Sequence, residues 1–305
     1  MSWLVTGTSG LLGSTLAARL RREGTTVVGL DVRAGAQTDC LGTLASREDV
    51  DRAVAKATAG GQRLVGVVHA GALHKPDLAE RERVEFVDVN IRGTLNVLEA
   101  VPEGTPVIVC TTTSLFGHAL VDKDARAAVW IDEDVVPRVK NMYGASKEAA
   151  EIMCRLMHQV RHLPIAMLRL SRFFQEEDDD PGRLQLAPDR TLKMLEYLHR
   201  RVHVDDAVQA CLDAHAALVD GRVACDAFII AAPTPFVRGE DEADLLSRPE
   251  DVVRRRCGDG IVDTFLAAGH TFIPIDRVYD SGKAVRTFGW SPVHTFAHVA
   301  AGDGS

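Results

Sequence analysis

The sequence predicts an α/β protein built on a doubly wound parallel sheet, with a smaller C-terminal lobe. Three observations lead to this prediction. Short β-branched runs alternate with longer amphipathic stretches over the first two thirds of the chain, which is typical of βαβ units. A glycine-rich turn, Gly7 to Gly13, separates the first run from the first amphipathic stretch. Runs such as Val107-Ile108-Val109 hardly alternate with polar residues, as expected of Rossmann-type strands buried on both faces.

The individual elements follow from the hydrophobic spacing. Strands are predicted at residues 3–6, 26–31, 64–69, 106–111 and 165–170, and helices at residues 11–23, 47–57, 84–100 and 143–162. An acidic turn at residues 176–182 ends this alternation, and a helix near 205–219 and a strand near 227–231 restore it. We therefore predict a Rossmann core of residues 1–171 plus about 201–232, and a small substrate lobe of about 172–200 plus 233–305.

The composition limits the function classes. The 305 residues include 35 Lys+Arg and 43 Asp+Glu, a formal net charge of −8, and 46% are hydrophobic. This apolar content can bury a large core and excludes disordered and fibrous classes. A net negative chain lacks the basic excess of proteins that bind phosphate backbones or anionic lipid. We expect neither a nucleic acid nor a membrane as a partner.

The cysteines and the N-terminus indicate the compartment. Six cysteines lie far apart without a C-x-x-C pair, which predicts buried thiols of a reducing compartment and no metal site. The strand-like run Trp3-Leu4-Val5 begins almost at Met1, a pattern unlike that of a signal peptide. We expect a cytoplasmic protein.

Three glycines at three-residue spacing predict a dinucleotide site between the first strand and the first helix. Gly7 permits a tight turn, Gly10 lets the backbone approach a pyrophosphate, and Gly13 allows close helix–strand packing. The helix N-terminus offers N–H groups to the phosphates. Asp31 ends the second strand, where a carboxylate accepts ribose hydroxyls and repels a 2′-phosphate, so NAD is favoured over NADP although Arg33 lies nearby. A plain strand–helix turn is the alternative.

Tyr143 and Lys147 are candidates for proton transfer. Their four-residue separation at the start of a predicted helix places both side chains on one face. An ammonium group a few Å away favours the phenolate of a tyrosine, whose reference pKa is ~10. Such a pair can take a proton from a substrate hydroxyl while hydride leaves the same carbon for nicotinamide. A solvated helix face is the alternative, because the Y-x-x-x-K pattern is common.

Several motifs occur in the order typical of one enzyme family. They are Thr6-Gly-x-x-Gly-x-x-Gly13, His69-Ala-Gly-Ala72, Asn90-x-x-Gly93-Thr94, Thr112 through Phe116-Gly117, Tyr143-x-x-x-Lys147 and His203-Val-Asp-Asp206. Over roughly residues 3–210 the chain resembles the extended short-chain dehydrogenase/reductases, in particular the NAD-dependent sugar epimerase/dehydratase group typified by UDP-galactose 4-epimerase. The motifs are specific for this family, and they do not specify a substrate.

The resemblance implies a catalytic triad of Thr112, Tyr143 and Lys147, in which Thr112 orients the substrate oxygen and Lys147 also binds the nicotinamide ribose. The neighbouring hydroxyls of Thr111, Thr113 and Ser114 leave the first assignment open by one position. The resemblance also implies a homodimer formed through the helices at 84–100 and 143–162, and a structural role for His69. The residues expected to hold the cofactor are Gly7, Ser9, Gly10, Leu11, Gly13, Asp31, Ala70, Gly71, Ala72, Asn90, Tyr143 and Lys147.

Departures from the family pattern reduce the number of reactions and substrates that the sequence is compatible with. The family's 4,6-dehydratases carry an Asp-Glu pair directly after the catalytic Thr, where this chain has Thr113-Ser114, so a dehydratase is disfavoured. The segment between Arg172 and His203 is shorter than expected for a full nucleotide-sugar lobe, which favours a smaller or unusual substrate. Reversible oxidation of an alcohol and epimerisation through a transient ketone both need only hydride transfer and Tyr143.

Candidate substrate contacts are basic or polar. Arg172, Arg200 and Arg201 could together clamp a carboxylate or a phosphate, and the alternative is ion pairing with the acidic run at 176–180. Thr113 and His74 are further candidates, and a solvated loop position is the alternative for His74.

We therefore predict an NAD-dependent oxidoreductase of the epimerase/dehydratase type, which transfers hydride at a secondary hydroxyl of a sugar-like or polyol substrate with Tyr143 as the base. The alternative is a nucleotide-sugar 4-epimerase with tightly held NAD and a transient 4-keto intermediate. A third hypothesis is an inactive relative that keeps NAD(H) as a structural or redox-sensing ligand. The presence of Thr112 beside the Tyr143 motif argues against it.

Overall fold

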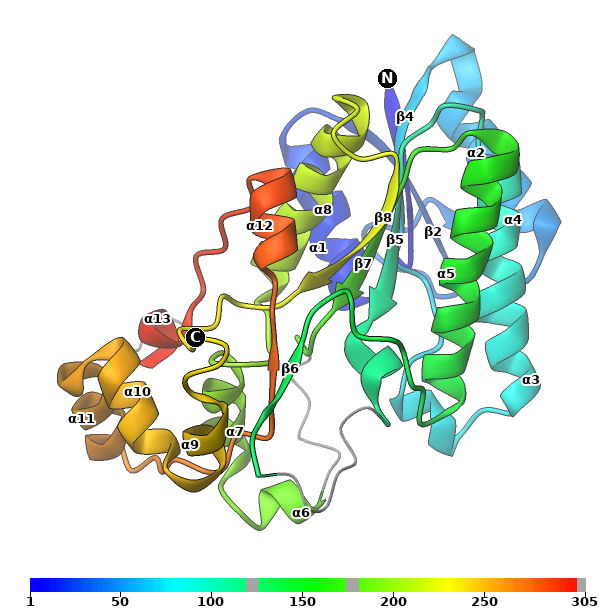
Figure 1. Cartoon of the computed structure of the whole chain (residues 1–305). Coiled ribbons are helices and arrows are strands. Elements are labelled where there is room, and N and C mark those ends of the chain that lie inside the picture. The colour runs from blue at the N-terminus through cyan, green and yellow to red at the C-terminus, as the bar shows by residue number, and fades with distance from the viewer. Residues whose placement is uncertain (119–125, 174–180, 301–305) are drawn as a thin grey trace.

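A parallel seven-stranded sheet forms the centre of the protein (Figure 1), and the computed structural model describes residues 1–118, 126–173 and 181–300. The strand order is β3-β2-β1-β4-β5-β7-β8. The order reverses direction beside β1, which is the arrangement of a doubly wound fold. The predicted α/β class is confirmed. The strands of this sheet are β1 Ser2–Thr6, β2 Thr26–Asp31, β3 Cys40–Leu41, β4 Leu64–His69, β5 Val107–Thr112, β7 Ile165–Leu170 and β8 Cys225–Ile230.

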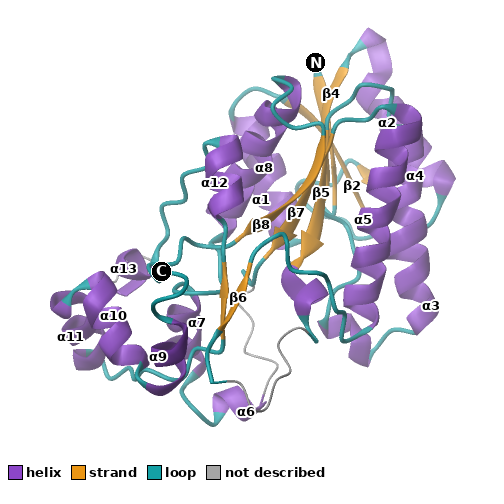
Figure 2. Cartoon of the chain, viewed as in Figure 1, coloured by secondary structure: helices purple, strands orange, loops and turns teal. Residues whose placement is uncertain are grey.

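Helices cover both faces of the sheet. In Figure 2, α1 Leu11–Arg22, α8 Val204–Val219 and α12 Gly282–Phe288 lie on one face, and α2 Arg47–Thr58, α4 Gly93–Ala100 and α5 Met142–Arg161 lie on the other. Each face has its own apolar core, which includes Leu16 and Phe228 on the first and Val50 and Val97 on the second. Burial on both faces explains why the strands show no alternation of apolar and polar residues.

The helix expected at residues 84–100 is divided into three parts. The α3 helix Arg83–Phe86 leads into a π-helical turn, η3 Val87–Arg92, which α4 continues. A π turn adds one residue to the α-helical repeat, and such turns are frequent at functional sites. The extra residue rotates the following side chains, and Asn90 within the turn becomes buried.

The small lobe has a separate core. A short parallel pair, β6 Val129–Ile131 and β9 Arg277–Tyr279, connects it to the main sheet region. Its apolar centre contains Leu195, Val252 and Phe265. Its helices are α6 Pro181–Leu184, α7 Asp189–Glu196, α9 Glu242–Ser247, α10 Pro249–Cys257, α11 Asp259–Ala267 and α13 Phe296–Ala300. The arrowheads of β5 and β7 point toward this lobe in Figure 2, so the carboxyl edge of the sheet faces it.

Two segments cross the domain boundaries expected from the sequence. Helix α12 packs on α8 and β8, and Phe288 and Trp290 belong to the same apolar core as β1 and α1. Strand β6, which precedes residue 171, pairs with β9 instead of joining the seven-stranded sheet. We therefore propose a core that also includes residues 281–290 and a lobe that also includes 127–131. Among the helices that the structure describes, not one combines the length and apolar character that a membrane crossing requires.

Candidate active site

The glycine-rich turn links β1 to α1 as the sequence predicts. Gly7 has a φ of 76°, a left-handed conformation that glycine adopts without strain. A methyl group on Gly13 would lie 2.2 Å from the Gly7 carbonyl oxygen, and one on Gly7 would lie 2.7 Å from the Gly71 nitrogen. A methyl on Gly10 would meet only that carbonyl oxygen within 4 Å, at 3.3 Å. The packing of the protein itself therefore requires glycine at 7 and 13, whereas Gly10 borders open space.

Asp31 fastens this turn to the end of β2. Its Oδ2 accepts a hydrogen bond of 2.9 Å from the backbone N–H of Ser9, and its Oδ1 accepts one of 2.9 Å from the N–H of Arg33. The Ser9 hydroxyl donates to the Arg33 carbonyl oxygen at 2.8 Å. A carboxylate oxygen has two acceptor directions, so these bonds leave Asp31 with capacity for further donors. The structure thus brings Ser9 and Asp31 together beside the open side of Gly10.

His69 ends β4 in a buried hydrogen-bond network. Its Nδ1 lies 2.8 Å from the Thr6 hydroxyl, and its Nε2 lies 3.0 Å from the Thr94 hydroxyl. The Thr6 hydroxyl oxygen also accepts from the Gly71 N–H at 3.0 Å. Burial, together with the charge of Lys147, lowers the pKa of His69 to about 3. His69 is therefore a neutral, packed histidine that holds the loop of Ala70, Gly71 and Ala72 against the glycine turn.

Asn90 positions the segments around the catalytic candidates. Its Oδ1 accepts from the Leu73 N–H at 2.8 Å, and its Nδ2 donates to the Leu73 carbonyl at 3.0 Å and to the Ser146 hydroxyl at 2.9 Å. Ser146 in turn donates to the Tyr143 carbonyl at 2.9 Å. Asn90 is 1% exposed. The expected contact between Asn90 and a cofactor stays a prediction.

Thr112, Tyr143 and Lys147 come together at the carboxyl edge of the sheet. Thr112 is the last residue of β5, and Tyr143 and Lys147 lie one turn apart at the start of α5, which Asn141 caps by accepting from the Gly144 N–H at 2.9 Å. The Thr112 side chain lies beside the Tyr143 phenol and acts to lower its pKa. All three catalytic candidates are buried, so the alternative of a solvated helix face for Tyr143 and Lys147 is wrong.

The protein environment shifts both ionisable groups of this trio toward their neutral forms. Burial raises the pKa of Tyr143 to about 12, and the Thr112 side chain opposes that shift. Burial also lowers the pKa of Lys147. Burial and Thr112 therefore influence the pKa of the Tyr143 phenol more than Lys147 does. This differs from the sequence-based expectation that the charge of Lys147 favours the phenolate.

His74 lies beside the phenol in the loop after β4. The His74 and Tyr143 rings have centroids 5.9 Å apart, and the His74 backbone N–H donates to Asp77 Oδ2 at 2.6 Å. Burial and the charge of Lys147 lower the pKa of His74 to about 4. The ring is thus a partly buried, neutral neighbour of Tyr143.

The arginines singled out in the sequence surround one carboxylate that the sequence analysis missed. Glu196, at the end of α7, is 1% exposed. Its Oε1 accepts from Arg200 Nε at 3.0 Å and its Oε2 from Arg201 Nη1 at 2.9 Å. Arg183 donates to the same Oε1 at 2.8 Å, and Arg172 Nε lies 3.6 Å from it. Glu196 is therefore the shared partner, while the acidic run at 176–180 lies outside the described residues.

Two further polar groups beneath the site were also missed. Glu151 on α5 holds Arg169 of β7 in a buried bidentate pair and accepts from the Thr111 hydroxyl at 2.9 Å. Burial raises the pKa of Tyr279 of β9, and the nearby Arg277 and Thr113 oppose that shift. No sequence motif marks these contacts, because each joins residues from distant elements.

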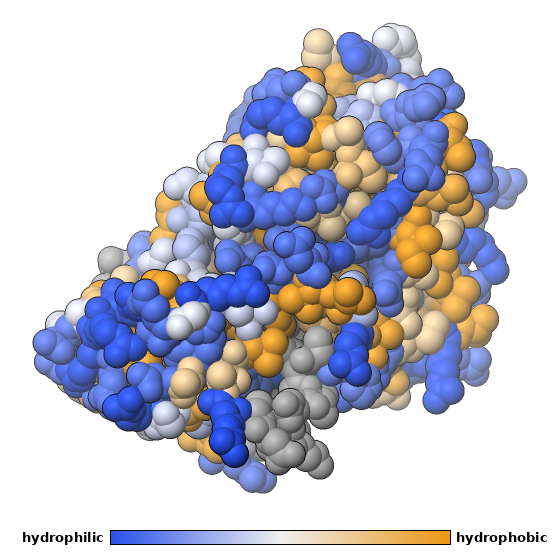
Figure 3. Space-filling view, in the orientation of Figure 1, coloured by the Kyte–Doolittle hydropathy of each residue, from blue (hydrophilic) through white to orange (hydrophobic). Residues whose placement is uncertain are grey.

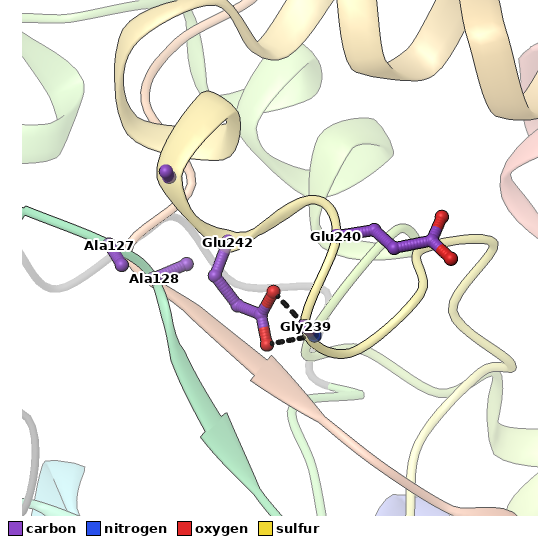
Figure 4. A pocket seen from close by; sticks show the side chains of 6 residues that line it. Ala127, Ala128, Gly239, Glu240 and Glu242 are labelled. Carbon is purple, nitrogen blue, oxygen red and sulfur yellow. Dashed lines mark hydrogen bonds between the residues drawn. The ribbon is translucent and has the colours of Figure 1, made fainter.

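Two surface pockets lie elsewhere. The first, of about 400 Å³, lies in the small lobe, where Glu242 accepts from the Gly239 N–H at 2.7 Å (Figure 4). The second, of about 570 Å³, lies between the start of α5 and the segment formed by the short helix η2 Pro76–Ala79 and α3. Neither of these two pockets is lined by Thr112, Tyr143 or Lys147.

Comparisons with known proteins show the family of the chain. The sequence profile of the "NAD dependent epimerase/dehydratase family" matches residues 3–226. A dTDP-glucose 4,6-dehydratase of Xanthomonas campestris pv. campestris is 29% identical over 182 residues, which are 54% of this chain and 51% of that protein. The chain thus spans about half the length of the curated relatives it matches.

The fold is similar to those of solved structures over almost the whole chain. A short-chain dehydrogenase/reductase superfamily protein from Agrobacterium tumefaciens with bound NAD has a TM-score of 0.66 and 18% identity, covering 99% of this chain and 96% of that one. The UDP-N-acetylglucosamine 4-epimerase from Bacillus cereus has a TM-score of 0.63 and 19% identity, covering 99% and 97%. Because the family profile covers more than half of the sequence, the chain belongs to the NAD-dependent epimerase/dehydratase family.

Proposed function

We propose that this protein transfers hydride between NAD and a secondary hydroxyl of a sugar-like or polyol substrate. The observation that carries the proposal is the buried trio of Thr112, Tyr143 and Lys147 beside the glycine-rich turn, at the carboxyl edge of the sheet. Ligands of open α/β sheets bind at this edge, next to the point where the strand order reverses.

The residues present fit a nicotinamide dinucleotide. Gly10 borders open space, the start of the 12-residue α1 helix supplies unpaired N–H groups, and Asp31 keeps acceptor capacity for ribose hydroxyls. When bound, the nicotinamide would accept or supply the hydride. The carboxylate at position 31 favours NAD over NADP, and Lys147 would donate to the nicotinamide ribose. Leu11, Ala70 and Ala72 complete the proposed lining.

Tyr143 would move the proton. With its pKa raised to about 12, the phenol is protonated at neutral pH and can donate to a ketone oxygen. In the opposite direction, the phenolate form of Tyr143 is needed. A positive charge near the ring, in addition to that of Lys147, would lower the pKa of Tyr143 toward neutrality. Thr112, whose side chain lies beside the phenol, would hold the substrate oxygen against Tyr143.

The residues after Thr112 support hydride transfer without elimination of water. Thr113 and Ser114 occupy the turn η4 Thr113–Phe116, and neither carries a carboxyl group that could act as acid or base. The same observation leaves open a nucleotide-sugar 4-epimerase with tightly held NAD, because transfer of hydride out and back through a 4-keto intermediate requires no further group.

An anionic substrate group would lie toward the small lobe. Arg172, two residues after β7, forms a parallel β-bridge with Arg201, the residue after Arg200. The Arg172 side chain is 27% exposed whereas Arg200 is 10% exposed, so we propose Arg172 as the principal contact and Arg200 as its support. Thr113 and His74 are proposed to contact the substrate near the reacting carbon.

An apolar stripe on α5 supports a homodimer. Ile152, Leu156 and Val160 are 55%, 45% and 61% exposed and lie at four-residue spacing. Apolar side chains gather along the side of Figure 3 where α5 lies in Figure 1. Val84 and Val87 of the adjoining α3–η3 segment add to the stripe at 55% and 38%. Exposed apolar stripes of this kind mark association surfaces.

The six free thiols support the proposed cytoplasmic location.

The test is a turnover assay with matched variants. The protein is incubated with NAD and a panel of polyols, aldoses, uronic acids and nucleotide sugars, and both NADH absorbance and sugar products are followed. NADH accumulation supports the dehydrogenase, and an isomerised product without NADH supports the 4-epimerase. Tyr143→Phe is expected to lower either rate by about 10²–10⁴-fold, the usual contribution of a general acid–base group. Tyr197→Phe removes another buried phenol as control. Unchanged turnover in Tyr143→Phe contradicts the proposal, and NAD binding without any turnover favours the inactive relative.

A further inference from the structure

A group of histidines and aspartates lies where the C-terminal segment meets the start of α8. His203 is the N-cap of α8, Asp205 lies in its first turn, and His294 belongs to the segment between α12 and α13. One ligand atom from each of these three residues lies within 4.8 Å of the other two. The His203 and His294 rings are stacked with centroids 3.7 Å apart, and His203 Nδ1 lies 3.7 Å from Asp205 Oδ2.

Asp206 orients one of the two imidazoles. Its Oδ2 lies 3.1 Å from His294 Nδ1 and accepts from the His294 backbone N–H at 2.9 Å. A carboxylate accepts hydrogen bonds, so Nδ1 of His294 carries the proton and Nε2 carries the lone pair. A carboxylate that holds the N–H of an imidazole, and so fixes its tautomer, is the typical support for a histidine that ligates a metal.

We propose that His203, Asp205 and His294 form a binding site for one divalent transition metal ion, with zinc as the expected ion. Two imidazole nitrogens and one carboxylate oxygen are a common set of three protein ligands for zinc, and water completes the tetrahedron. Imidazole also suits copper, nickel and cobalt, whereas two nitrogen ligands disfavour magnesium and calcium.

To reach a common metal ion, the His203 ring must rotate out of its stack on His294, because a metal lies in the plane of each imidazole that ligates it and the two rings are nearly parallel. Ligand bonds of about 2.1 Å in a tetrahedron place the ligand atoms about 3.4 Å apart, compared with the present limit of 4.8 Å. Asp205 is 62% exposed and His203 is 31% exposed, so both can rotate into solvent space. His203 Nδ1 would exchange its 3.3 Å hydrogen bond with the Asp205 N–H for the metal, and water can satisfy that exposed N–H.

The site would join the two parts of the molecule. The C-terminal segment is already anchored to α8 by Trp290 Nε1, which donates to the Asp206 carbonyl at 3.0 Å, and by the Val293 N–H, which donates to Asp206 Oδ1 at 3.0 Å. The next helix, α13, packs on α7 and α11 of the small lobe. A metal held by His203 and His294 would therefore fasten the lobe to the Rossmann core, independently of the chemistry at Tyr143.

The test measures metal binding by the untagged full-length chain after removal of metal with a chelator. Cobalt(II) is titrated by visible absorption and zinc(II) by calorimetry, for the wild type and for three variants. Asp205→Asn and His294→Gln each alter one proposed ligand. His162→Asn is the matched control, because His162 is an exposed histidine with a φ of 50°, which asparagine tolerates.

The proposal predicts one cobalt per chain with the absorption of a four-coordinate ion, at least tenfold weaker binding in both ligand variants, and unchanged binding in the control. Zinc is expected to raise the melting temperature of the wild type and not of Asp205→Asn, because a ligand that binds the folded state stabilises it. Absence of binding, or equal binding by wild type and Asp205→Asn, overturns the proposal. Since Asp205 is exposed, its variant decides the matter even if His294→Gln fails to fold.

Discussion

Glu151 and Arg169 form a buried bidentate ion pair directly behind the candidate active site. Arg169 Nε donates to Glu151 Oε1 at 3.0 Å and Nη2 donates to Oε2 at 2.8 Å, and the two side chains are 2% and 5% exposed. The pair joins α5, which carries Tyr143 and Lys147, to β7 and through Thr111 to β5. It therefore fixes the distance between the helix and the strand that supply the catalytic candidates.

Removal of one partner of this pair should destabilise the protein strongly. Arg169→Met leaves the Glu151 carboxylate buried without its main partner, and we expect a loss of about 3–5 kcal/mol in the free energy of unfolding. Arg155 contacts the same carboxylate at 3.2 Å but is 47% exposed, so Arg155→Met should cost less than about 1 kcal/mol. Urea denaturation measures both. Similar losses in the two variants would show that burial does not determine the strength of the pair.

Substitutions at two glycines of the turn should have different effects, one on folding and the other on cofactor binding. Gly13→Ala places a methyl group 2.2 Å from a backbone oxygen, so we expect a marked loss of stability measured by thermal unfolding. Gly10→Ala meets that oxygen at 3.3 Å and should fold, yet it should weaken NADH binding at least tenfold in a fluorescence titration. Unchanged NADH affinity in Gly10→Ala would remove Gly10 from the proposed site.

Asp31 should determine the choice between the two cofactors. Asp31→Asn keeps acceptor capacity for the Ser9 N–H but removes the negative charge that repels a 2′-phosphate. We expect the ratio of NADH affinity to NADPH affinity to fall by about tenfold or more. Glu23→Gln, an exposed carboxylate at the end of α1, is the control for net charge. A ratio that stays the same in both variants contradicts the proposed role of Asp31.

The buried His69 should make stability depend on pH in the acidic range. Its pKa is about 3 in the folded protein and ~6.5 in the unfolded chain, so the unfolded state binds more protons below pH 6.5. The contribution of the neutral His69 to the free energy of unfolding is present above pH 6.5 and is lost as the pH falls toward 3. Between pH 7 and pH 5 the free energy of unfolding should fall by about 2 kcal/mol. Urea denaturation at the two pH values should show that His69→Gln loses less stability over this interval than the wild type. An equal loss in the variant would assign the pH dependence to other groups.

Periodicity predicted the sheet and its helices because each of these elements carries its own apolar pattern. The boundaries at β2, β4 and β7 agree with the sequence to the residue. The π turn around Asn90 was not predicted, and the local pattern does not contain the contacts that Asn90 makes with Leu73 and Ser146. The same limit applies to α12, whose Phe288 packs in the same apolar core as β1, far away in the sequence.

The sequence alone determined the turn at Gly7, the one-turn spacing of Tyr143 and Lys147 and the end of β2 at Asp31, because these depend on residues close in the chain. Only the tertiary structure decided which charges meet. It placed Arg172 and Arg183 at the Glu196 carboxylate and His294 beside Asp206, 88 positions away, and it buried Tyr143 deeply enough to raise its pKa to about 12. Desolvation and ion pairing depend on neighbours brought together by folding, and a linear pattern does not record those neighbours.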